Sequence, residues 1–260
     1  MVKFNIITLF TNLFELYLNF SVFKKNREKG IFDYKLIDLR EFGLGKHRKV
    51  DDYPYGGGKG MVLMPEPLSK AIESIDERGI VIYFSPKGLK LDNNFVKKII
   101  FDYDKFLEEK NLKNNNLNDT NNIKKNNVNN INYKIFTLIC GRYEGIDQRI
   151  IDLYVDIEIS LGDFVLTSGE IPALAFIDSL CRFLEGFLEK EAISEESFEN
   201  FLLEYPHYTR PKVFKNLKVP DVLVSGDHKK IEDWRFIERL KITKKNRKDL
   251  YYKFLEENNE

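Results

Sequence analysis

The stretch "YVDIEISLGDFVLTSGEIPALAFIDSLCRF", Tyr154–Phe183, predicts a strand, a loop and a helix in succession. Its β-branched beginning, Tyr154–Ser160, is typical of a buried strand, and its apolar end has the composition of a packed helix. The loop between them contains Gly162, Ser168 and Gly169. Because glycine has no Cβ, such small residues let a ligand or another segment come close to the backbone.

Four earlier segments also have the composition of strands: Phe4–Phe10, Tyr34–Leu39, Gly79–Pro86 and Tyr133–Cys140. An amphipathic helical pattern follows the first of them up to about Gly30. We expect Pro86 to stop the third strand. Apolar strands separated by helical crossovers predict an α/β fold, with a mostly parallel sheet and helices on both faces. Ligands of such sheets bind in the loops after the carboxyl ends of the strands.

Glycine-rich loops follow three of these strands, and a fourth lies between the second and third strands. Their sequences are "SPKG", "GRYEG", "SLGDFVLTSGE" and "YPYGGGKGM". Each alone fits ordinary turn chemistry, but four in one sheet favour a shared pocket. The last contains Gly56–Gly60, where Met61 stands in place of the hydroxyl residue of a phosphate-binding loop. A nucleoside-triphosphate site is therefore not expected.

The overall charge restricts how the chain could bind nucleic acid. Its 260 residues are 43% hydrophobic and have a formal net charge of zero, which suits one core domain or a core domain with a small second domain. No global field would attract nucleic acid, so any binding would use local patches such as Gly45–Lys49 or Arg239–Lys253. The second patch fits a charged helix face equally well.

The cysteines and the N-terminal segment indicate a cytoplasmic protein. Cys140 and Cys181 lie in apolar stretches without CxxC spacing, which predicts buried free thiols in a reducing compartment. With three scattered histidines, a Cys/His metal site is not expected. The apolar segment Phe4–Phe20 contains Glu15 and three asparagines, too polar for a membrane span, and has no signal-peptide cleavage site.

Changes in composition divide the chain into domains. Residues 1–188 would form the α/β domain, interrupted at Asn111–Asn132 by an asparagine-rich insertion that we expect to be disordered and without function. The acidic segment 189–203 is typical of a linker. Residues 204–260 have helical periodicity and would form a small helical domain.

Five long motifs occur in one order along the chain. They are "DDYPYGGGKGMVLMPEPL", "YFSPKGLKL", "CGRYEGIDQRI", "SLGDFVLTSGEIPALAFIDSLCRF" and "YPHYTRPKVFKNLKVPDVLVSGDHKKIEDWR". Together they resemble the bacterial tRNA (guanine-N1)-methyltransferase family, the TrmD type, of the knotted SPOUT superfamily. The resemblance covers nearly the whole chain except the asparagine-rich insertion and the last few residues.

This resemblance implies a fold, a reaction and partners. The fold would contain a deep trefoil knot made by the exit loops, and the protein would be a homodimer with each active site at the subunit interface. S-adenosylmethionine would donate a methyl group to N1 of the tRNA guanosine at position 37, immediately 3′ of the anticodon and preceded by another guanosine. Magnesium is implied for the reaction, but no motif identifies its ligands.

The resemblance also assigns cofactor contacts to the loops after the third, fourth and fifth strands. The residues are Tyr83, Phe84, Ser85, Pro86, Gly88, Gly141, Glu144, Leu161, Gly162, Asp163, Phe164, Val165 and Leu166. Main-chain groups suit this role because their donors and acceptors match the edge of adenine. The family usually has glycine where this chain has Ser168. We expect the loop to keep its path if Ser168 has an ordinary φ.

Catalysis would need a base for the proton on guanine N1 and a cation for charge on O6. Arg182 matches the family's catalytic arginine, and its planar fork suits O6. Alignment on Ser197-Phe198 puts Glu196 where the family has aspartate, in a linker one residue shorter. Glu195 is the alternative base. Without the resemblance, Arg182 would be read as a surface ion pair and these acids as solvated groups.

The resemblance and the local basic or aromatic sequence together indicate five candidate tRNA contacts. They are His47, Arg48, His207, Arg210 and His228. Cations and aromatics suit phosphate contact and base stacking, although the aromatics of the small domain fit a structural role equally well. The alternative function is an RNA- or nucleotide-binding protein without catalysis, because an expected aspartate is replaced by Glu196.

Overall fold

The computed structural model describes residues 1–116, 133–189 and 196–258. The chain divides into two compact units, Met1–Phe187 and Leu188–Glu260. None of the helices in these described ranges is both long and apolar enough to cross a membrane.

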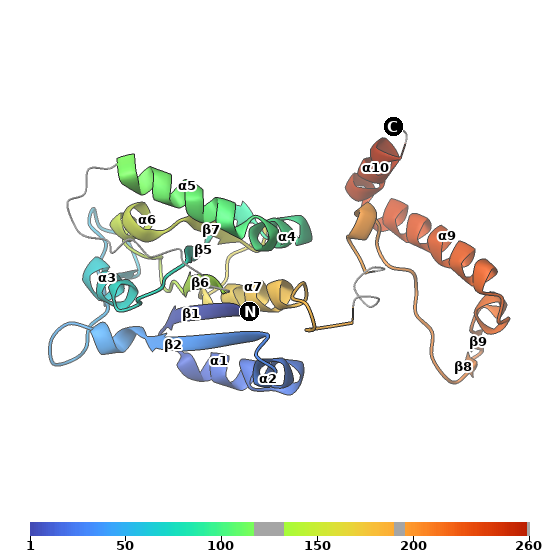
Figure 1. The fold of residues 1–260 in the computed structure, drawn as a ribbon, viewed down its shortest axis with the longest axis horizontal. Coiled ribbons are helices and arrows are strands. Elements are labelled where there is room, and N and C mark those ends of the chain that lie inside the picture. The colour runs from blue at the N-terminus through green and yellow to red at the C-terminus, as the bar shows by residue number, and fades with distance from the viewer. Residues whose placement is uncertain (117–132, 190–195, 259–260) are drawn as a thin grey trace. The chain divides into compact units, whose positions relative to one another are not determined.

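The first unit is built on a five-stranded sheet with the strand order β2-β1-β6-β5-β7 (Figure 1). Every neighbouring pair in it is parallel. The strands are β1 (Val2–Thr8), β2 (Phe32–Asp38), β5 (Ile80–Lys90), β6 (Lys134–Ile139) and β7 (Ile157–Ser160), and a separate two-stranded ribbon pairs β3 (Asp51–Asp52) with β4 (Val62–Leu63). The parallel α/β sheet predicted from the apolar runs is confirmed.

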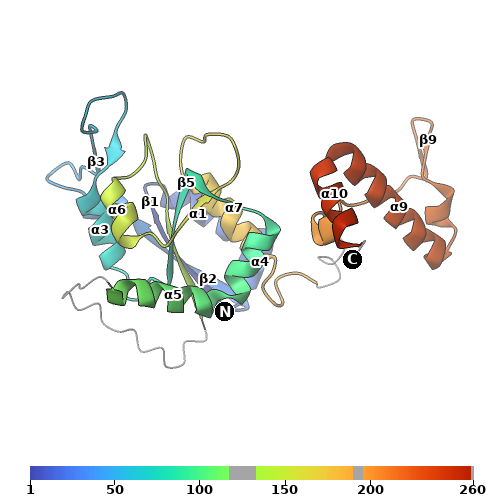
Figure 2. The ribbon, with the colours of Figure 1, turned by 90° about the horizontal axis from the view of Figure 1, so that it is seen from above.

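Helices cover both faces of this sheet (Figure 2). The helical segments are α1 (Thr11–Leu18), α2 (Ser21–Glu28), η1 (Leu39–Phe42), α3 (Pro65–Glu73), α4 (Asn93–Phe101), α5 (Tyr103–Asn116), α6 (Gln148–Tyr154) and α7 (Glu170–Cys181). Ile7 of β1 packs with α3 and α6 in an aliphatic core. Phe4 points to the other face, since side chains alternate along a strand, and joins an aromatic layer with Phe136 and Phe176.

The strand β5 does not stop at Pro86, so that prediction is wrong. It runs to Lys90, and its register with β7 shifts between Phe84 and Leu89. This irregularity removes Pro86 from the ladder, so its missing N–H leaves no sheet partner unsatisfied. A Cβ on Gly88 would lie 2.4 Å from the carbonyl carbon of Glu158. Gly88 is therefore required by the close approach of β5 and β7.

Two other boundaries differ from the sequence-based expectation. The helix expected up to Gly30 is two helices, α1 and α2, and Ser21 at the start of α2 has a left-handed φ of 49°. The fifth predicted strand begins later, at Ile157, because α6 extends to Tyr154. The two buried cysteines are free thiols, as predicted, and burial raises the pKa of each.

The asparagine-rich segment begins inside a helix. The helix α5 continues to Asn116, six residues into the segment predicted to be disordered, and the remainder of that segment lies outside the described residues. The ammonium of Lys110 in α5 contacts the Gly79 carbonyl and the Asp156 carboxylate, each at 2.7 Å. These contacts tie α5 to the ends of β5 and β7.

Residues 117–132 are expected to be dispensable. Joining Asn116 to Tyr133 with a short glycine linker retains Lys110 and its contacts, and a change of loop length costs little free energy. The free energy of unfolding in urea should change by less than about 1 kcal/mol. Insoluble protein, or a larger loss of stability, would contradict the prediction.

The second unit consists mainly of two helices, α9 (His228–Asn246) and α10 (Lys248–Glu257). Its smaller elements are η2 (Glu199–Phe201), the hairpin β8 (Val213–Phe214) with β9 (Leu217–Lys218), and η3 (Asp221–Val224). Leu202 is buried, and the Leu203 amide donates to the Thr243 hydroxyl of α9 at 2.8 Å. The last residues of the segment expected as a linker are therefore packed onto α9.

Candidate active site

The loops after β6 and β7 meet at the carboxyl edge of the sheet. The Gly169 amide donates to the Gly141 carbonyl at 2.8 Å, and Ser168 pairs with Arg142 in an antiparallel bridge. A Cβ on Gly169 would lie 2.7 Å from the Gly141 nitrogen. The small residues of this loop thus allow contact with the backbone of the β6 loop. Ser168 has no positive φ, so it follows this path without backbone strain.

The predicted cofactor glycines lie at this junction. A Cβ on Gly141 would lie 2.8 Å from the ring of Tyr83. Burial, with a smaller contribution from Glu158, raises the pKa of Tyr83 and keeps its phenol neutral. Gly162 has a φ of 153°, and a Cβ there would lie 3.0 Å from the ring of Phe164. Gly162 is partly exposed, whereas Gly141 is buried and the Tyr83 ring fills the space where its side chain would stand.

The β7 loop presents three consecutive apolar side chains to solvent. Phe164 is 54% exposed, Val165 83% and Leu166 40%. Leu161 and Gly162 are partly exposed, whereas Asp163 is exposed. Such a run on a surface is typical of a segment that a ligand or another chain covers.

The glycine-rich segment reaches the same edge by way of the β3–β4 ribbon. The Glu144 amide donates to the Met61 carbonyl at 3.0 Å, and a Cβ on Gly60 would lie 2.4 Å from Oε1 of Glu144. The Leu63 amide donates to the Gly145 carbonyl at 3.0 Å. The fourth glycine loop therefore lies beside the β6 loop, where the sequence predicted a shared pocket.

A buried carboxylate anchors the start of α7 beneath these loops. Glu170 is 1% exposed, and its Oε1 accepts from the Thr8 hydroxyl at 2.8 Å. Its Oε2 has no hydrogen-bond partner in the described part of the chain. Thr8 ends β1, so this bond connects two segments at the carboxyl edge.

Thr8→Val should destabilise the fold, because the Glu170 carboxylate would lose its donor while remaining buried. The expected cost is about 1–3 kcal/mol, measured by urea unfolding. Ser74→Ala serves as control, since the Ser74 hydroxyl donates to the Ala71 carbonyl at an exposed helix end, and its loss should cost about 0.5 kcal/mol or less. Equal stability of the two variants would contradict the assigned role of Thr8.

The two candidate catalytic residues belong to different units. Arg182 is the C-cap of α7, in the first unit. At 1.5 Å of rise per residue it lies about 18 Å along the helix from Glu170. Glu196 is partly exposed and precedes η2, in the second unit. The alternative base, Glu195, lies outside the described residues.

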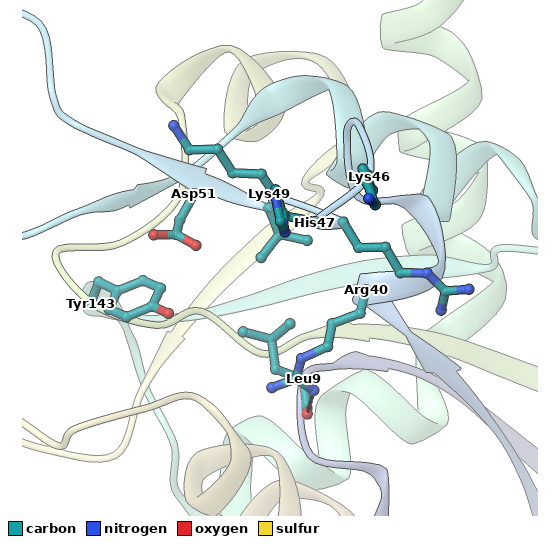
Figure 3. A pocket seen from close by; sticks show the side chains of 9 residues that line it. Leu9, Arg40, Lys46, His47, Lys49, Asp51 and Tyr143 are labelled. Carbon is teal, nitrogen blue, oxygen red and sulfur yellow. Dashed lines mark hydrogen bonds between the residues drawn. The ribbon is translucent and has the colours of Figure 1, made fainter.

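His47 and Arg48, two of the candidate tRNA contacts, line a cavity of about 530 Å³ at the exits of β1 and β2 (Figure 3). Its lining residues are Leu9, Arg40, Lys46, His47, Arg48, Lys49, Val50, Asp51 and Tyr143. Sequence reasoning missed Arg40 and Tyr143. Their signal was their position: Arg40 directly follows the strand predicted at Tyr34–Leu39, and Tyr143 lies in the loop after the strand predicted at Tyr133–Cys140.

The remaining candidate contacts are exposed on the second unit. His207 lies 4.8 Å from the ring of Tyr205, measured between centroids, and its Nε2 is 3.9 Å from a Glu204 carboxylate oxygen. Arg210 and His228 are exposed, the latter at the start of α9. Within the described ranges of the chain, no three His, Cys, Asp or Glu side chains form a cluster that could hold a metal ion.

Comparison with known families gives one match across both units. The sequence model described as "tRNA (Guanine-1)-methyltransferase TrmD" matches residues 2–104 and 118–253. The chain belongs to this family. The TrmD match contains every candidate site residue named above and omits all of α5 after its first two residues.

Individual TrmD relatives give the same result. A tRNA (guanine-N(1)-)-methyltransferase of Borrelia duttonii is 45% identical over 257 residues, covering 98% of this chain and 94% of the relative. A protein with the same description from Clostridioides difficile is 44% identical over 96% of this chain and 98% of the relative. One from Caldicellulosiruptor saccharolyticus is 43% identical, with 95% and 89% coverage.

Proposed function

We propose that this protein transfers a methyl group from S-adenosylmethionine to N1 of guanosine 37 in tRNA, immediately 3′ of the anticodon and preceded by another guanosine. The observation that carries the proposal is the meeting of the small-residue loops after β6 and β7, beside Tyr83 of β5, in a chain of the TrmD family. Membership of this family implies S-adenosylmethionine as methyl donor.

The β6 and β7 loops, together with Tyr83–Pro86 of β5, fit the cofactor. Main-chain groups near Gly141 and Leu161–Leu166 would bind its adenosine and methionyl parts, and Tyr83–Pro86 would form a wall of the adenine side. Bound S-adenosylmethionine supplies a sulfonium methyl that is already activated. The exposed Phe164, Val165 and Leu166 would then be covered on binding or by a second subunit.

The active form would be a homodimer with its sites at the interface. Exposed apolar side chains gather on α1, including Leu16 at 76%, with Phe20 at 73% just after it. The Tyr17 hydroxyl bonds to the Asp178 carboxylate, which places α1 beside α7. Arg182 is far along α7 from the loops of its own subunit. We propose that it acts in the site of the facing subunit.

Within this site, Glu196 would accept the N1 proton and Arg182 would stabilise charge on O6. The base makes N1 nucleophilic, and the guanidinium fork donates two hydrogen bonds to developing negative charge. Because Glu196 belongs to the second unit, binding of tRNA to that unit would bring the base to the guanosine.

We also propose a knotted first unit, a tRNA-binding second unit, a cytoplasmic location and a requirement for magnesium. The exit loops of the first unit would form a deep trefoil knot, and the second unit would bind tRNA through His207, Arg210 and His228. The protein would work in the cytoplasm. We propose that the reaction depends on magnesium, but the described residues present no cluster that fits it, so no step is assigned to the ion.

The test is methyl transfer from labelled S-adenosylmethionine to tRNA transcripts, with and without magnesium. The transcripts vary guanosine 37 and the preceding guanosine separately. Label should enter the wild-type transcript and be lost when guanosine 37 is replaced. Binding of cofactor and tRNA without transfer would instead support the alternative, a binding protein that has lost catalysis.

A further inference from the structure

Cations gather around the cavity at the exits of β1 and β2. We call this the basic pocket, defined by Arg40, Lys46, His47, Arg48 and Lys49 of its lining together with Arg142, which precedes the lining residue Tyr143 and shares the Phe10 ring with Arg40. Figure 3 shows side chains from η1, the loop after it and the β6 loop gathered around the cavity. Along the carboxyl edge, the small-residue loops thus follow β6 and β7, and the basic groups other than Arg142 follow β2.

Two arginines are held in fixed positions beside one aromatic ring. The guanidinium carbon of Arg142 lies 4.4 Å from the ring centroid of Phe10, and that of Arg40 lies 5.4 Å from it. Arg40 also donates to the Leu9 carbonyl. Each guanidinium is oriented by these contacts and still has N–H groups to spare, since it has five donors.

The positive charge of the pocket is only partly balanced. Lys49 pairs with Asp52 at 2.9 Å, and Arg40 lies 3.9 Å from Asp38. Asp51 is the acidic residue of the lining. Within the described ranges, no carboxylate lies at ion-pair distance from Arg142, Lys46 or Arg48. Cations held close together without counter-charges favour an anionic ligand.

We propose that the basic pocket binds backbone phosphates of the RNA strand next to the target guanosine, with Arg40 and Arg142 as phosphate donors. This inference rests on the proposed function and deepens it. Arg142 follows Gly141 of the cofactor loops and precedes Tyr143, which lines the pocket and is 53% exposed. A strand held here would lie directly beside the cofactor, with Tyr143 available for a base to stack on.

The experiment measures tRNA affinity at several salt concentrations for the wild type, Arg142→Gln and Arg40→Gln. Arg149→Gln is the matched control. Arg149 lies in the same motif as Arg142, "CGRYEGIDQRI", but is exposed and paired with Asp147 at 2.8 Å. Each pocket variant should bind tRNA about tenfold more weakly. Each should also lower the slope of log affinity against log salt by about 0.7, the value for one single-strand phosphate contact. The Arg149 variant should match the wild type in both.

Calorimetry with S-adenosylmethionine shows whether each variant retains its fold and cofactor site, and unchanged affinity is expected. The proposal is overturned if Arg142→Gln and Arg40→Gln retain the wild-type salt slope, or lose no more affinity than Arg149→Gln. Those outcomes leave the proposed methyl transfer intact if the wild type labels tRNA. Conversely, wild type that binds tRNA through these arginines but transfers no methyl group would refute only the proposed reaction.

Discussion

Glu196→Gln is expected to slow methyl transfer by about 10²–10⁴-fold, the usual contribution of a general base. Glutamine preserves the size of the side chain but cannot accept the N1 proton. The measurement is single-turnover transfer at saturating tRNA, because steady-state turnover can report product release. Cofactor affinity should remain unchanged, since the role proposed for Glu196 is to accept the guanosine proton and includes no contact with the cofactor.

Glu195→Gln tests the alignment behind this prediction. If Glu196→Gln keeps the wild-type rate and Glu195→Gln loses it, the base is one residue earlier. If both keep the wild-type rate, neither glutamate is the base. Glu196→Asp tests how far the carboxylate must extend to reach guanine N1, because aspartate and glutamate have similar unperturbed basicity and differ by one methylene.

Gly141→Val is expected to weaken S-adenosylmethionine binding by about 10- to 100-fold. Its Cβ alone would lie 2.8 Å from the Tyr83 ring, so overpacking would displace this ring and the Gly141 backbone, which the proposed cofactor contacts. Lost cofactor contacts worth about 1.4–2.7 kcal/mol correspond to that loss of affinity. The variant would also put a side chain where the cofactor meets the main chain. Calorimetry measures the affinity, and circular dichroism checks that the sheet persists.

Two further glycine variants test whether the loss of cofactor affinity comes from the cofactor loops. Gly162→Val lies in the β7 loop and should also weaken cofactor binding, because its φ of 153° and the Phe164 ring 3.0 Å away disfavour a side chain. Gly45→Val is the control, because Gly45 also has a positive φ, of 66°, but no atom lies within 4 Å of its Cβ. It should retain cofactor affinity. Unchanged affinity in both loop variants would refute the proposed cofactor pocket.

Much of the parallel sheet could be predicted because its strands are buried on both faces. Their near-continuous apolar runs stand out in the sequence, and the five predicted strands correspond to β1, β2, β5, β6 and β7. The ends of the strands were predicted less accurately than their centres. Pro86 would stop a regular strand, but the irregular pairing of β5 with β7 accommodates it. Such pairing depends on a segment far away in the sequence.

Composition, periodicity and motif order can be read from the chain without its fold, and they predicted the fold class, the family and the candidate site residues. Which of these residues meet became visible in the folded chain. The fold placed Gly169 against Gly141 and joined Arg40 and Arg142 at Phe10. It also put Arg182 at the far end of α7 from the glycine loops. The physical reason is that strand order and helix direction set distances between residues remote in sequence, and no local pattern records them.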